Sequence, residues 1–156
     1  MKMLLATIAL LVSTTCLHAA DPQGFALWKG SMVKNAGKEL ATKMDAEKFA
    51  WLPMATYSNH LIGISHRERS GGAELHQTQA DIFVVEGGKA QLVVGGTIVA
   101  PKTVKPHEIR GTSIEGGITK QLAPGDIVHI PANVPHQLKI APGTAFTYLV
   151  IKVDSN

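Results

Sequence analysis

A carboxylate and an imidazole stand two residues apart at the start of the segment ELHQTQADIFVVEGG, residues 74 to 88. On an extended strand, Glu74 and His76 point to the same face, because side chains alternate with a period of two. Asp81 follows across a short polar turn and begins an apolar run that ends in two glycines. Imidazole nitrogens and carboxylate oxygens bind divalent transition metals. The spacing therefore favours a metal or ligand pocket at the mouth of a strand.

A second polar cluster lies in the segment PGDIVHIPANVPHQL, residues 124 to 138. It contains a Pro-Gly-Asp turn, a short apolar run and a loop bounded by two prolines. His136 follows that loop and begins the next strand. The imidazole of His136 can join the first cluster only if the two segments lie side by side in the folded chain.

The elements that must position these residues are strands. From Tyr57 onward, short apolar or alternating runs are separated by glycine, proline and asparagine turns. In HLIGISHRE, for example, alternation places His60 and His66 on one face together with two isoleucines. About ten short strands with tight turns predict a sandwich or a closed barrel. Alternating strands with polar residues on one face favour a barrel with a usable interior.

Taken together, the two segments resemble the two motifs of the cupin superfamily. The resemblance spans residues 57 to 153 and implies an all-β fold, an antiparallel β-barrel of the double-stranded β-helix or jelly-roll type. In the first motif, the metal-ligand positions and a following glycine fall on Glu74, His76, Asp81 and Gly88. In the second, the matching residues are Pro124-Gly125-Asp126, Ile130-Pro131-Ala132 and Pro135-His136, with His136 as the fourth ligand.

The chain departs from the common cupin ligand set of histidines and one glutamate. Glu74 stands where the first histidine is usual, and Asp81 stands where glutamate is usual. All four positions nevertheless carry groups that bind metal. The resemblance therefore implies a divalent metal (Mn, Fe, Ni or Zn) on Glu74, His76, Asp81 and His136. Two alternatives remain open: a ligand pocket without metal, and internal ion pairs with a structural role alone.

The two carboxylates are expected to have unequal roles, because a catalytic metal site keeps open positions for substrate. We predict that Glu74 is the ligand, since it is paired with His76 at the spacing of the first motif. We predict that Asp81 either fixes the geometry of the ligands or serves as the catalytic proton acceptor.

Three further residues are candidates for the substrate pocket. Arg110 could clamp a substrate carboxylate bidentately; the alternative is a surface arginine or an ion pair with Glu108 or Glu115. His60 and His66 could line the mouth of the pocket as proton carriers. The alternative for both histidines is a place on an edge or surface strand.

Residues 1–20 have the layout of a secretory signal peptide: a lysine, an apolar run from Met3 to Val12 and small residues before Ala19-Ala20. The apolar run is too short to span a bilayer. This layout predicts export to the periplasm or secretion. Cys16, the only cysteine, could instead be a lipid-anchor site, but the polar residues before it fit that processing poorly.

The rest of the chain divides into an arm and a barrel. Residues 21–56 mix apolar and lysine positions at roughly helical spacing, which predicts an arm that is partly helical. Residues 57–156 are expected to form the cupin barrel. The arm could cover one end of the barrel or contact a second subunit, and the resemblance to cupins implies a homodimer.

Composition narrows the function further. The chain has 156 residues, 45% hydrophobic and 17% charged, with a net charge of +3. The lysines form no basic run, so nucleic acid is not an expected partner, and no membrane contact is expected after signal cleavage. Two hypotheses follow for the small-molecule pocket: a metal-dependent oxidoreductase, isomerase or lyase, and a non-catalytic protein that binds or senses a small ligand.

Overall fold

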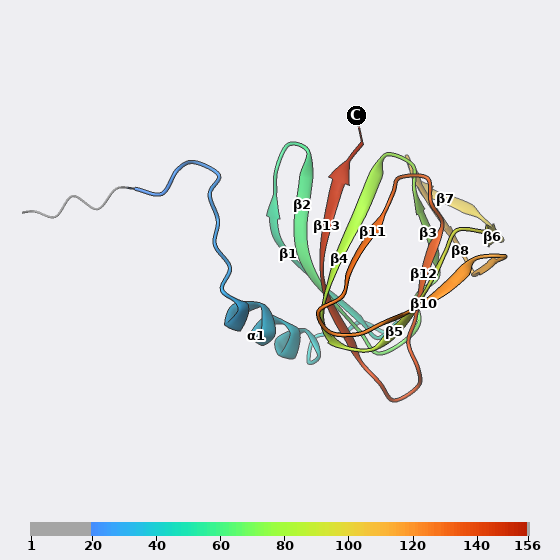
Figure 1. Ribbon diagram of the computed structural model, residues 1–156, viewed down its shortest axis with the longest axis horizontal. Helices are drawn as coiled ribbons and strands as arrows, with labels where there is room; N and C mark the ends of the chain where they lie inside the picture. Colours follow the sequence, from blue (N-terminus) through green and yellow to red (C-terminus); the bar gives the residue numbers. More distant parts are fainter. Residues whose placement is uncertain (1–19, 156) are drawn as a thin grey trace, which may run out of the picture.

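The computed structural model describes residues 20–155, which form one helix and thirteen strands (Figure 1). The first sheet has five strands, in the order β1 (Phe49–Thr56), β2 (His60–Arg67), β13 (Phe146–Asp154), β4 (Gln79–Gly88) and β11 (Ile127–Ile130). The second sheet has six strands, in the order β10 (Ile118–Leu122), β5 (Ala90–Val94), β12 (His136–Lys139), β3 (Ala73–His76), β8 (Glu108–Gly111) and β7 (Lys102–Lys105). A two-stranded ribbon joins β6 (Thr97–Val99) to β9 (Ser113–Glu115).

The strands pair antiparallel, as the short runs and tight turns predicted. The antiparallel β-sheets are confirmed, whereas the strand pairing in the described part of the chain does not define a single closed barrel. Within residues 20–155, hydrogen bonding divides the strands between separate sheets. Figure 1 shows the two larger sheets facing each other around a common interior.

The main core fills the space between the two sheets. Phe83 and Val85 of β4 are buried together with Tyr148 and Val150 of β13, at every second position along each strand. Burial of such apolar side chains is the main favourable term in folding. The same alternation turns Asp81 inward, because it lies two residues before Phe83 on β4.

The helix α1 (Gly30–Leu40) covers the outer face of β1 and β2. Its buried residues Val33 and Leu40 form a second apolar cluster with Ala50 of β1 and Ile64 of β2. At Gly37 the helix comes close to β13, and a Cβ there would lie 2.9 Å from the Thr147 side chain. The expected helical arm therefore exists, but the segment 21–56 also supplies the edge strand β1.

Two expectations concern the N-terminus and membranes. The predicted signal peptide and Cys16 lie almost entirely in residues 1–19, outside the described residues. Between residues 20 and 155, no helix is long and apolar enough to cross a membrane.

Candidate metal centre

Strand pairing explains why the two sequence clusters meet. Glu74 and His76 lie on β3, and β12 pairs with β3 so that His136 stands directly opposite Glu74. Asp81 lies on β4 in the other sheet and faces them across the interior. The fold thus brings together all four residues that the cupin motifs singled out.

The donor atoms of three of these residues are close enough to share one ion. Glu74, His76 and His136 each offer a ligand atom, and the three atoms lie within 4.8 Å of one another. Asp81 Oδ2 is 3.3 Å from His76 Nε2 and 3.5 Å from His136 Nε2. Two imidazoles with one carboxylate form the ligand pattern of several divalent-metal sites.

The orientation of His76 depends on a residue that the sequence analysis did not connect with it. Glu108 of β8 stands opposite His76 in the strand register, and its buried carboxylate accepts a hydrogen bond from His76 Nδ1. With Nδ1 donating, the lone pair of Nε2 faces the interior. A carboxylate behind a ligating histidine is a common feature of metal sites, because it fixes the ring and raises its basicity.

His136 is oriented in the same sense by the backbone. Its Nδ1 donates to the carbonyl oxygen of Val134 at 3.1 Å. Its Nε2 is buried and has no hydrogen-bond partner among residues 20–155. Buried polar atoms without a partner are rare and call for an explanation. The free lone pair points toward Glu74 and Asp81, at 3.9 and 3.5 Å, which is the arrangement a metal ligand needs.

A lysine enters the same cluster from β13. Lys152 stands opposite Asp81 in the strand register, and its ammonium lies 2.7 Å from Asp81 Oδ1 and 2.8 Å from His76 Nε2. The sequence analysis missed Lys152. The signal was its spacing, since Lys152 continues the every-second-residue pattern of Tyr148 and Val150 that faces the interior.

Ion pairs hold the remaining charged groups. Arg110 pairs with the carboxylates of both Glu74 and Glu108. Arg110 forms the ion pair with Glu108 that the sequence analysis gave as one alternative, and its role toward a substrate stays a prediction. Arg67 of β2 lies near the same Glu74 oxygen, at 3.6 Å.

His60 and His66 do not line this site, and that part of the prediction is wrong. They share a face of β2, as their spacing indicated, but it is the outer face. Residues Ser65 and Arg67 face the interior instead. His66 donates or accepts a hydrogen bond with Thr147 at 2.8 Å beside α1, and His60 stacks on Tyr57.

The cluster shifts the ionisation of its members. Burial raises the pKa of Asp81, but the neighbouring His136, His76 and Lys152 outweigh it and hold the pKa well below its usual range. Burial likewise raises the pKa of Glu108, yet contact with His76 and Arg110 leaves it lowered. Burial and Lys152 oppose protonation of His76, but Asp81 and Glu108 leave its pKa raised. Charged groups next to partners of opposite sign behave in this way.

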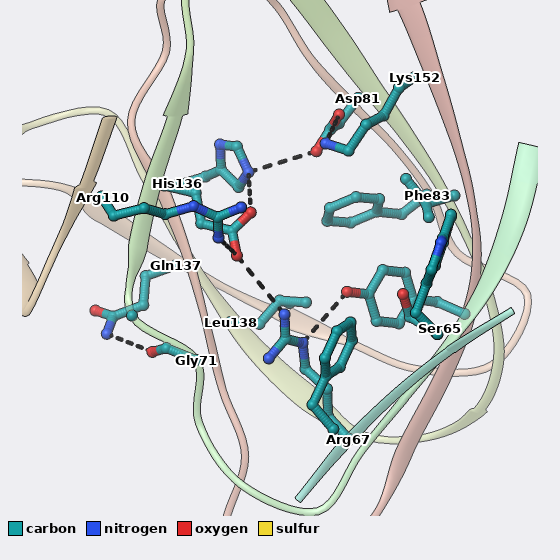
Figure 2. Close-up of a pocket in the computed structure, with 16 residues that line it drawn as sticks. Ser65, Arg67, Gly71, Asp81, Phe83, Arg110, His136, Gln137, Leu138 and Lys152 are labelled. Atoms are coloured by element: carbon teal, nitrogen blue, oxygen red, sulfur yellow. Dashed lines mark hydrogen bonds and ion pairs between the residues drawn. The ribbon is translucent and has the colours of Figure 1, made fainter. Parts of the chain in front are cut away.

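A cavity of about 160 Å³ opens beside the cluster, between the two sheets (Figure 2). Four aromatic side chains contribute to its wall, together with Leu138 and Val150: Phe49, Trp51, Phe83 and Tyr148. Charged groups of the cluster reach it as well: Glu74, Asp81, Arg110, His136 and Lys152. The candidate metal ligands therefore adjoin a space that a small molecule could enter.

Comparison with known proteins identifies the fold. No protein-family model matches the sequence, and no curated protein matches it. Among solved structures, the cupin domain of Cnp3 from Schizosaccharomyces pombe is similar with a TM-score of 0.52 at 9% identity, over 69% of this chain and 66% of that one. The DMSP lyase DddQ from Ruegeria pomeroyi is similar at 0.51 and 16% identity, over 71% and 51%. The polyketide cyclase RemF from Streptomyces resistomycificus is similar at 0.50 and 17% identity, over 70% and 68%.

These similarities confirm the fold that the resemblance implied. The chain has the fold of the cupin superfamily. At such low identities the similarity concerns the fold alone, and the activities of these proteins do not carry over to this chain. One fold hosts many functions, so the function of this chain depends on the residues of its site.

Proposed function

We propose that this chain is a small cupin that binds one divalent transition metal through Glu74, His76 and His136 and acts on a small molecule in the adjoining cavity. The observation that carries the proposal is the buried Nε2 of His136. This atom has no hydrogen-bond partner among residues 20–155, and it points at two carboxylates. A metal ion would supply the missing partner.

The chain's own residues fit such an ion. Hydrogen bonds to Glu108 and to the Val134 carbonyl fix both imidazoles with Nε2 facing the same point. Glu74 completes a set of two nitrogens and one oxygen, which suits Mn, Fe, Ni or Zn. When bound, the metal would act as a Lewis acid that polarises an oxygen of the substrate.

The geometry supports a positioning role for Asp81 rather than the role of proton acceptor. Its carboxylate bonds Lys152, and its pKa is held well below the usual range. A carboxylate with a lowered pKa is a weak base at neutral pH. Asp81 therefore fixes Lys152 and faces both imidazoles, while Glu74 is the metal ligand.

Size limits what the cavity can take. Its volume of about 160 Å³ is close to that of a protein cavity known to hold benzene, about 150 Å³. The proposal therefore concerns a molecule with about one ring.

The proposed function also includes export, which the signal-peptide layout of residues 1–20 supports, and assembly into a homodimer, which the cupin fold supports.

Elemental analysis tests the metal directly. Full-length protein, purified without chelator from cells grown with transition metals, is expected to contain one metal ion per chain. Dialysis against a chelator should remove it, and one added equivalent should restore it. Protein that holds no metal after this reconstitution would contradict the proposal.

Lys152 favours a second candidate function, a cupin that binds a small ligand without metal. Its ammonium already lies at hydrogen-bonding distance from His76 Nε2 and Asp81. The chain thus supplies a positive charge where a metal ion would bring one. Elemental analysis separates the two candidates, because this second function predicts a metal-free protein that still binds a ligand in the cavity.

A further inference from the structure

Arg67 presents a second chemical feature of the cavity, away from the two histidines. It ends β2, and only 14% of its side chain is exposed. Its Nε donates to the hydroxyl of Tyr148 at 3.4 Å, and its guanidinium carbon lies 4.1 Å from the centre of the Phe49 ring. Figure 2 shows this guanidinium at the cavity, across from His136 and Asp81.

Most hydrogen-bond donors of this guanidinium are unused. An arginine carries five N–H groups, two of them on each terminal nitrogen. Within residues 20–155, the hydrogen bond of its side chain is the one from Nε to Tyr148. The Glu74 oxygen is 3.6 Å from Nη2, beyond hydrogen-bonding distance, and Arg110 pairs with that same oxygen. The terminal N–H groups thus donate no hydrogen bond among residues 20–155, although Nη2 forms a long ion pair with Glu74, and they are available to a ligand.

The charge of Arg67 persists in this setting. An arginine side chain is not deprotonated in proteins, so the guanidinium carries its positive charge at the cavity. Mostly buried charges are normally paired or hydrogen-bonded, since an unpaired one costs free energy. Arg67 has one such partner, Glu74, at 3.6 Å, and shares it with Arg110, so its terminal donors can take a further anion from the cavity.

The other cations of the cavity have closer carboxylate partners than Arg67 has. Arg110 pairs with Glu74 and Glu108, and Lys152 pairs with Asp81. One guanidinium with a free fork suits a single negative charge, and its planar geometry matches a carboxylate bidentately. Aromatic side chains of Phe49 and Trp51 stand beside it and suit an apolar ligand body.

We propose that Arg67 binds the carboxylate of a small, mostly apolar ligand about as large as one six-membered ring, whose body packs on the aromatic wall of the cavity. The inference rests on the proposed function only in taking this cavity as the ligand site. It holds with or without a metal on Glu74, His76 and His136.

Calorimetric titration of the chelator-treated full chain tests this inference. Benzoate is the probe, and benzamide is its neutral counterpart of the same shape. Benzoate is expected to bind at least about 10-fold more tightly, since hydrogen bonds to charged groups add that much. Arg67→Gln should remove this preference. Arg69→Gln is the matched control, because Arg69 is exposed and pairs with Glu47, and it should keep the wild-type preference.

The comparison of the two probes on the wild-type chain needs no variant, so it remains valid if Arg67→Gln fails to fold. Equal affinity for benzoate and benzamide, or no binding of benzoate at 10 mM, roughly where affinity becomes too weak for a specific site, would overturn the inference. Unchanged benzoate affinity in folded Arg67→Gln would also overturn it. Loss of metal binding in elemental analysis would remove the proposed metal function and leave this result standing.

Discussion

The ammonium of Lys152 lies 2.8 Å from Nε2 of His76, the ring nitrogen that faces the interior of the cluster. A metal ion on His76 must therefore displace this ammonium. Two positive charges a few ångströms apart repel by several kcal/mol at the effective dielectric of a protein site. The ammonium of Lys152 thus competes with a metal ion for the Nε2 atom of His76.

Lys152→Met is expected to raise metal affinity by about 10-fold or more, because it removes this repulsion and frees the Asp81 carboxylate. Competition with a chromophoric chelator measures the effect. Lys120→Met is the matched control, since Lys120 is an exposed lysine on β10, and it should leave the affinity unchanged. Equal affinities in wild type and Lys152→Met would show that Lys152 does not compete.

The histidine ligands are tested by removing each ring. His76→Ala and His136→Ala should each lose stoichiometric metal, because each deletes one of the donor atoms that converge on the site. His129→Ala serves as the control, since His129 is exposed on β11. Elemental analysis of the three variants decides the matter. Stoichiometric metal in both ligand variants would mean that the ion is held elsewhere.

The two carboxylates should respond unequally to neutralisation. Glu74→Gln is expected to weaken metal binding by about 10-fold or more, a loss typical even of groups that act on a metal through a ligand. Asp81→Asn should keep most of the metal, because Asp81 is engaged by Lys152. Metal titrations of both variants measure this difference. A larger loss from Asp81→Asn would exchange the roles of the two residues.

Strand alternation and the motif register predicted much of this placement from the sequence, and the exceptions have physical causes. Period-two alternation correctly put Glu74 and His76 on one face, and the motif register correctly predicted that His136 would meet them. Alternation also grouped His60 with His66. It could not tell the inner face of β2 from the outer one, which α1 covers through long-range packing.

The sequence analysis did not assign Glu108 and Lys152 to the site, for a related reason. Each acts through strand pairing with a residue far away in the sequence, His76 for Glu108 and Asp81 for Lys152. Such registers depend on the order of strands in the sheets, and no local spacing encodes that order. Barrel closure likewise depends on which edge strands pair, and the pairing among residues 20–155 defines separate sheets.

Glu108 should make the stability of the fold depend on pH. Its pKa is lowered from the ordinary value of 4.5, so its contribution to stability is full above that value and is lost as the pH falls through the lower folded pKa. In Glu108→Gln this acid-sensitive part is absent, and the free energy of unfolding should vary less between about pH 5 and 3. Urea unfolding across this range measures the effect, with the exposed Glu115→Gln as control. A wild-type slope in Glu108→Gln would contradict the assignment.

Tryptophan fluorescence can locate a ligand within the molecule. The chain has two tryptophans: Trp51 lines the cavity, whereas Trp28 packs against the cluster under α1. Trp51 lies directly over Gly63, where an added Cβ would come within 2.1 Å of its ring. Benzoate in the cavity should change the emission of Trp51 because it alters the surroundings of that ring. Trp51→Phe should therefore abolish the change on titration, and Trp28→Phe should preserve it. Gly63→Ala should weaken benzoate binding, since its methyl group displaces the Trp51 ring from the cavity wall. A fluorescence change that survives Trp51→Phe and disappears in Trp28→Phe would place the ligand beside α1 instead.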